Sequence, residues 1–121
     1  MTPGAGVPEP DLEDALAPIS IDVRPGTAHG EWVVAVAGEI DVATSPELRQ
    51  AIDRVLGSAD RVTIDLAATT FIDSSGLGVL VAALKQAKER GHDAMTLRGV
   101  QEPVRRVLEI TGLTGLFAVE D

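Results

Sequence analysis

The most informative segment of the chain is Thr70-Phe71-Ile72-Asp73-Ser74-Ser75-Gly76-Leu77-Gly78-Val79-Leu80. It leads from a strand and a loop, through two adjacent hydroxyls, into the first turn of an apolar helix. A serine at a helix start lies beside unpaired backbone N–H groups and the positive end of the helix dipole, so a phosphate there would meet hydrogen-bond donors. The segment therefore suggests a serine that acts as a switch.

Strands and helices alternate on both sides of this segment. Alternating apolar residues predict strands at 19–24, at 31–36 with Gly38 as its end, and at 62–66. The short loop between the first two strands favours an antiparallel hairpin. Ser45-Pro46 predicts a helix start with Ser45 as the N-cap, and Gly57 is placed to end this helix.

The C-terminal half continues the alternation. A loop is expected at 67–73, a helix at 75–90, short strands at 94–97 and 116–119, and between these strands a helix that Pro103 opens. After the hairpin the order is helix, strand, helix, strand, helix, strand. This order predicts an α/β fold with parallel β-α-β units and right-handed crossovers.

The composition indicates a single domain behind a tail. Of 121 residues, 45% are hydrophobic, which is enough for a core. Residues 1–18 hold four of the seven prolines and four acidic residues without a basic one. Such a segment cannot bury enough apolar surface to offset its ordering entropy, so we expect a flexible acidic tail at 1–18 and one domain at 19–121.

Charge and composition exclude several classes of partner. The net charge of −9 and an aromatic content of 2% argue against nucleic-acid binding, which uses basic surfaces and stacking rings. The absence of cysteine excludes zinc–thiolate sites and thiol catalysis. A signal peptide is lacking, and no apolar run approaches the ~20 residues that cross a bilayer. A cytoplasmic protein without membrane association is expected.

Enzymatic chemistry finds little support. The two glycines of the segment lack the third glycine of a dinucleotide fingerprint and the lysine of a P-loop. Neither Ser74 nor Ser75 has the glycine two residues earlier that a nucleophile elbow requires, and His29 and His92 are the only candidate bases. We therefore predict that the chain is not an enzyme and uses no cofactor.

Asp41, Asp65 and Asp73 could converge at the strand ends as metal ligands. They show no ligand spacing on a helix and have no histidine partner, so we favour three surface carboxylates over a metal site. Asp73, Ser74 and Ser75 also suit ordinary helix capping. The residues alone leave a modifiable serine and a plain cap as equal alternatives.

Three blocks of sequence carry a family resemblance. They are VTIDL at 62–66 with DSSGLG at 73–78, GEIDVAT at 38–44, and PVRRVLEITGL at 103–113. Together they resemble the STAS domain family, and most of all the small anti-sigma factor antagonists of bacteria. The resemblance covers about residues 19–119 in the right order. It implies an open mixed sheet, an antiparallel hairpin followed by parallel β-α-β units, with helices mainly on one face.

The resemblance also implies a function. Unphosphorylated antagonists of this family bind an anti-sigma factor that is a serine kinase, and this frees a sigma factor for transcription. The kinase phosphorylates the serine after the aspartate, here Ser74, and a PP2C-type phosphatase reverses the modification. Asp41 matches a family acid near that serine, and Ser75 matches a neighbouring hydroxyl that is not the main acceptor. The implied partner-binding residues are Asp41, Asp73, Ser74, Ser75, Gly76, Leu77 and Gly78.

Two points depart from the simplest form of this expectation. The chain ends at Asp121, where family members often carry a further helix, so part of the cover of the sheet would be missing and a homodimer would compensate. The alternative function is a STAS module that serves as a fixed structural subunit of a transporter or signalling complex, without a phosphorylation switch. An acceptor position that cannot be phosphorylated would favour that alternative, and Ser74 speaks against it.

Overall fold

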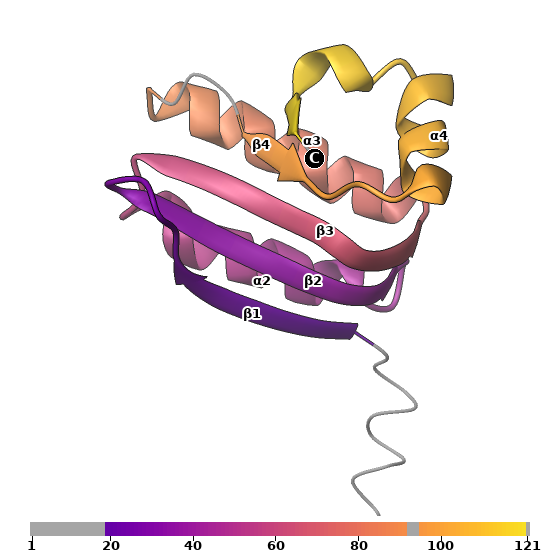
Figure 1. Cartoon of the computed structure of the whole chain (residues 1–121), viewed down its shortest axis with the longest axis horizontal. Coiled ribbons are helices and arrows are strands. Elements are labelled where there is room, and N and C mark those ends of the chain that lie inside the picture. Colours follow the sequence, from indigo (N-terminus) through magenta and orange to yellow (C-terminus); the bar gives the residue numbers. More distant parts are fainter. Residues whose placement is uncertain (1–18, 92–94, 121) are drawn as a thin grey trace, which may run out of the picture.

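The computed structural model describes residues 19–91 and 95–120. The tail predicted for 1–18, His92 and Asp121 lie outside the described residues. Five strands and three α-helices follow one another in the described part (Figure 1). Their bounds are β1 Ile19–Pro25, β2 Glu31–Ile40, α2 Ser45–Leu56, β3 Arg61–Ile72, α3 Ser74–Glu89, β4 Thr96–Arg98, α4 Glu102–Ile110 and β5 Ala118–Glu120, with a 3-10 turn at Thr114–Leu116.

The strands form one mixed sheet in the order β1-β2-β3-β4-β5. β1 and β2 pair antiparallel, and every later pair is parallel. The three crossovers step in the same direction across the sheet, so right-handed connections place α2, α3 and α4 on the same face. In Figure 1, α2 lies behind β2, and α3 lies behind β4. The predicted mixed sheet with helices on one face is confirmed.

The core lies between this face of the sheet and the helices. Val34, Ile64 and Leu97 contribute from three neighbouring strands, and their side chains are buried completely. The helices add aliphatic side chains with helical spacing, and these are Leu48, Ile52, Leu80, Leu84, Val104 and Leu108. Burial of each such side chain stabilises the fold by roughly 1.5–3 kcal/mol, so the aliphatic residues hold the helices on the sheet.

β2 and β3 extend beyond their predicted ends. β2 continues past Gly38 to Ile40, and β3 includes residues 67–72, which were expected to form a loop. The register between the strands shifts twice, and each shift gives β3 one residue more than β2. Such bulges break the inside–outside alternation that marks a strand in the sequence. The hydroxyl of Thr69, which is buried in this stretch, donates to the carbonyl of Val36 at 2.8 Å.

The helix starts also differ from the prediction by one residue. Thr44, not Ser45, is the N-cap of α2, and Ser45 is its first helical residue. The Thr44 hydroxyl is held at 2.8 Å from the Glu39 carbonyl, which fixes the turn before the helix. α3 and α4 likewise begin one residue earlier than expected. At the C-terminus, the 3-10 turn occupies the start of the predicted strand 116–119 and displaces it to β5.

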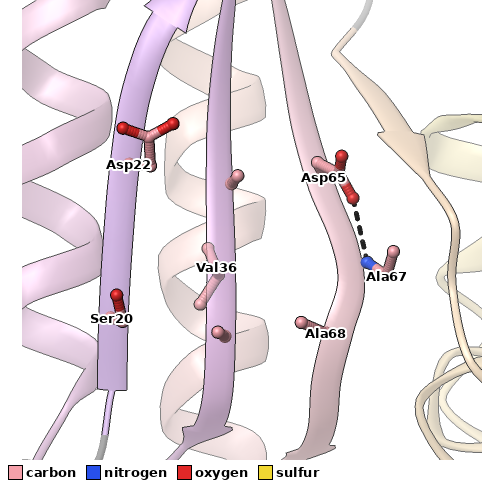
Figure 2. A pocket seen from close by; sticks show the side chains of 8 residues that line it. Ser20, Asp22, Val36, Asp65, Ala67 and Ala68 are labelled. Carbon is pink, nitrogen blue, oxygen red and sulfur yellow. Dashed lines mark hydrogen bonds between the residues drawn. The ribbon is translucent and has the colours of Figure 1, made fainter.

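The opposite face of the sheet carries small and charged side chains. A shallow pocket of about 210 Å³ lies there, lined by Ser20 and Asp22 of β1, by residues 35–37 of β2 and by Asp65, Ala67 and Ala68 of β3 (Figure 2). Ala35 lies between Asp22 and Asp65 in the register. The side chain of Ala35 is short and leaves space above β2. Arg24 reaches across this strand to within 4.0 Å of Asp65.

Candidate functional site

The candidate site lies where β2 and β3 end, at the right-hand edge of the sheet in Figure 1. These strands are parallel neighbours, so the segments that follow them emerge side by side. The backbone N–H of Asp73 donates to the carbonyl of Ile40 at 3.1 Å and ties the two ends together. The structure thereby brings the turn that begins at Asp41 next to the start of α3, as expected for parallel strands.

Asp73 is the N-cap of α3. Its backbone is extended, and its Oδ1 accepts hydrogen bonds from the N–H groups of Ser75 at 2.8 Å and Gly76 at 3.2 Å. An aspartate cap of this kind stabilises a helix by about 1 kcal/mol. It also occupies two of the donors that the sequence had offered to a phosphate. A phosphate at this helix start would have to compete with a carboxylate that is already bound.

Ser74 is the first residue of α3 and is exposed to solvent. Among the described residues, none forms a hydrogen bond with its hydroxyl, so the oxygen is available to an incoming enzyme. Ser75, the next residue, is half-buried. The two adjacent hydroxyls therefore differ in access, and Ser74 is the more accessible.

The remaining segment residues divide into buried and exposed positions. Gly76 and Leu77 are buried, and a Cβ at Gly76 would lie 2.6 Å from side-chain carbons of both Ile40 and Ile72. Gly76 thus lets the first turn of α3 seat against the ends of the two strands. Gly78 is exposed, and a Cβ there would meet nothing within 4 Å. Of these two glycines, Gly78 is therefore the one that lies at the surface.

Asp41 organises the turn before α2. Its Oδ1 accepts from the backbone N–H groups of Ala43 and Thr44, each at 3.0 Å, and its own N–H donates to the Thr44 hydroxyl at 2.9 Å. Thr44 is buried, so the turn is fixed from inside. Val42 at its tip is 74% exposed.

Sequence reasoning did not single out Val42 or Phe71, which is 45% exposed. An apolar residue within the polar turn 41–44 was an available signal for Val42. The bulges of β3 hid the outward orientation of Phe71.

The site is acidic. The segments 39–48 and 69–84 hold four carboxylates, Glu39, Asp41, Glu47 and Asp73, and neither lysine nor arginine. A complementary protein surface would therefore be basic, because opposite charges speed encounter and fix orientation.

The structure does not bring together the residues that were considered for a hydrolase with His29 as its base, or for a metal site at Asp41, Asp65 and Asp73. His29 lies in the loop between β1 and β2, at the opposite edge of the sheet from Ser74 and Ser75. Asp65 pairs with Ala35 in the middle of β2 and lies 3.3 Å from Arg98, so it does not join Asp41 and Asp73. No group of three or more metal-ligating side chains occurs among residues 19–91 and 95–120. In the same part of the chain, no helix is long and apolar enough to cross a membrane.

Comparison with known proteins agrees with this fold. The family model described as "Mlab, STAS domain" matches residues 23–119, and the chain belongs to the STAS domain family. Among curated relatives, the anti-sigma-B factor antagonist of Listeria monocytogenes is 34% identical over 105 residues. The match covers 85% of this chain and 90% of that protein.

Solved structures show the same architecture. An anti-sigma factor antagonist from Mycobacterium paratuberculosis superimposes with a TM-score of 0.71 at 33% identity, over 84% of this chain and 85% of that one. The Bacillus cell fate determinant SpoIIAA, solved in its phosphorylated form, superimposes with a TM-score of 0.64 at 18% identity, over 83% and 90% of the two chains. At that identity the likeness to SpoIIAA shows the fold alone.

Proposed function

We propose that this chain is a non-enzymatic anti-sigma factor antagonist whose binding is controlled by phosphorylation of Ser74. The unphosphorylated form binds an anti-sigma serine kinase and releases a sigma factor, and a PP2C-type phosphatase removes the phosphate and restores this binding form. The observation that carries the proposal is the exposed, unbonded hydroxyl of Ser74 at the start of α3. The names of the relatives support the same function.

Access and capping favour Ser74 over Ser75 as the acceptor. A kinase must bring its ATP γ-phosphate in line with the hydroxyl, which requires an open approach. Ser74 is exposed, whereas Ser75 is half-buried and its backbone N–H is bound by Asp73. Phosphate on Ser74 therefore needs no rearrangement of the helix start.

The phosphate opposes binding through charge, bulk and desolvation. It adds roughly −1.5 to −2 charge units beside Asp73 and Asp41. Because Asp73 already holds the N–H groups of Ser75 and Gly76, the helix start offers little compensation, and the phosphate remains in solvent. A close-fitting partner would have to desolvate it. A change of about 3 kcal/mol would weaken a complex ~150-fold.

We assign a separate role to each of the other residues of the proposed site. Asp41 and Asp73 fix the turn and the helix start, and their remaining carboxylate oxygens face the partner. Ser75 and Gly78 extend the contact surface along α3. Gly76 and Leu77 are buried, so we assign them the seating of the helix. The proposal places the protein in the cytoplasm with its kinase.

A mixture of the chain, its anti-sigma kinase and ATP tests the proposal directly. We expect mass spectrometry to place the phosphate on Ser74, and Ser74→Ala to abolish its uptake while Ser75→Ala retains it. Calorimetry should show that Ser74→Asp binds the kinase much more weakly than the unphosphorylated wild-type chain does, with an unchanged circular dichroism spectrum. Uptake that survives only in Ser74→Ala would move the acceptor to Ser75. Equal affinity of Ser74→Asp and wild type, without any uptake of phosphate, would favour a fixed structural subunit.

A further inference from the structure

Exposed apolar side chains gather at the same edge as Ser74. Four large hydrophobic side chains of the described part are strongly exposed, and two of them, Val42 and Phe71, lie at the ends of β2 and β3. The other two are Ile110, at the end of α4, and Leu116, in the 3-10 turn. Apolar groups exposed at the same end of two paired strands favour a protein contact there, whereas scattered single ones are ordinary.

Phe71 points away from the core. It pairs with Glu39 in the register, while the next pair, Ile40 with Ile72, is buried. Because successive strand residues point to opposite faces, Phe71 and Glu39 share the face that the helices leave open. The chain holds only two phenylalanines, and one of them, Phe71, leaves 45% of its surface exposed instead of adding to the core. Burial of an aromatic ring against a partner is a common source of hot-spot binding energy.

Val42 is presented by a rigid support. Asp41 and Thr44 close the turn on both sides of it with three hydrogen bonds of 2.9–3.0 Å. The Thr44 hydroxyl is also anchored to the Glu39 carbonyl. Valine is branched at Cβ and has few rotamers, so little conformational entropy remains to be lost when it is buried. A preorganised contact of this kind retains more of its burial energy on binding.

The surroundings define the chemistry of the occupant. Acidic residues border both side chains, with Glu39 beside Phe71 and Asp41 next to Val42, and no basic residue lies in segments 39–48 and 69–84. Apolar side chains that are flanked by carboxylates are complementary to an apolar depression rimmed by lysine or arginine. A second copy of this chain would bring acid against acid, so like-charge repulsion disfavours it.

We propose that Val42 and Phe71 are the apolar anchors by which the unphosphorylated chain holds its protein partner, at an apolar depression with a basic rim. This inference rests on the proposed function, since the partner is the anti-sigma kinase. The anchors supply binding energy that salt does not screen, whereas the acidic rim supplies steering that salt does screen. Phosphate on Ser74 then acts by holding the anchors away from their depression.

Calorimetry with the full chain and its kinase tests the anchors. We expect the double variant Val42→Ala/Phe71→Ala to bind on the order of 30-fold more weakly, the loss typical of a hot spot. The loss should be equal at about 0.1 M and about 0.5 M NaCl, because apolar burial is not screened. In the phosphorylation assay, KM should rise while kcat stays unchanged. Ile110→Ala, a truncation of a 79% exposed side chain at the end of α4, is the matched control and should bind as wild type.

Val42→Ala alone keeps the test independent of folding, because the side chain is largely exposed and its removal leaves the turn hydrogen bonds intact. Wild-type affinity of both variants, with normal phosphorylation of Ser74, would overturn the anchors and leave the proposed function standing. A loss that vanishes at high salt would overturn them as well. A wild-type chain that neither binds the kinase nor accepts phosphate would overturn the proposed function itself.

Discussion

Two glycines in one turn of α3 occupy opposite environments. A Cβ at Gly76 would lie 2.6 Å from Ile40 and Ile72, whereas a Cβ at Gly78 would meet open space. We expect Gly76→Ala to lower the free energy of unfolding by about 1–3 kcal/mol through overpacking. Gly78→Ala should raise it by roughly 0.5–1 kcal/mol, because alanine is the better helix former. Urea unfolding of both variants measures the two effects.

The pair serves as its own control, since both substitutions add the same methyl group within the same helix. A destabilised Gly78→Ala would contradict the open space at that position. If Gly78 is part of the contact surface, as we propose, the same variant should bind the kinase more weakly despite its greater stability.

The sequence located the start of α3, but it did not define the contacts made there. Asp73 and Ser74 were singled out, and capping was weighed against modification. The structure shows that Asp73 does cap the helix, through Ser75 and Gly76. Which donors a carboxylate occupies depends on side-chain geometry, which spacing along the chain does not define. The acceptor role of Ser74 stays a prediction.

At the scale of elements, β3 shows where sequence patterns fail. The alternation of Val62, Ile64 and Leu66 correctly predicted the start of the strand. The two register shifts then interrupt that alternation before the strand resumes its inward positions at Ile72. A bulge is compensated by local contacts, such as the Asp65 carboxylate accepting from the Ala67 N–H at 2.9 Å. In the sequence, this interrupted alternation is typical of a loop, and a loop was expected at 67–73.

Glu31 links the start of β2 to β3. A hydrogen bond from the Thr63 hydroxyl, at 2.7 Å, lowers the pKa of Glu31 below its ordinary value of 4.5, and the Ala28 N–H, Arg98 and Arg61 contribute in the same direction. A lowered pKa in the folded state means that the carboxylate stabilises the fold above pH 4.5. This contribution is lost as the pH falls through the folded-state value.

We therefore expect Glu31→Gln to be less stable than wild type at neutral pH, with the difference shrinking below pH 4.5. Urea midpoints across the acid range measure the convergence. Thr63→Val, which removes the hydroxyl donor and keeps the side-chain shape, should show the same convergence in part. A constant difference at every pH would show that the amide disturbs packing and not charge.

At the scale of the whole molecule, the order of elements was predictable and the surface was not. The alternation of strands and helices predicted the parallel sheet with its helices on one face, because few topologies satisfy right-handed short connections. Exposed residues such as Val42 and Phe71 follow no periodic pattern. Their gathering at one edge depends on the register of β2 with β3, which appears only in three dimensions.

The net charge of −9 has a kinetic consequence. We expect the association rate with a basic partner surface to fall steeply as NaCl rises from about 0.05 M to about 0.5 M, because steering is screened beyond the Debye length. The dissociation rate should change little. Stopped-flow association with the anti-sigma kinase measures both rates. Glu39→Gln, which removes one rim charge, should lower the association rate at low salt and converge with wild type at high salt.

The strict sequence of neighbours in the sheet also bears on how the chain is made. Each new strand adds to the outer edge of those already formed, and none has to insert between two earlier strands. Each strand therefore pairs with the strand just before it in the chain, and each parallel pairing closes a loop of a single β-α unit. The hairpin β1–β2 can form first, and each β-α unit can dock as it leaves the ribosome. The direction of synthesis is therefore also a direction in which the sheet can grow, one strand at a time.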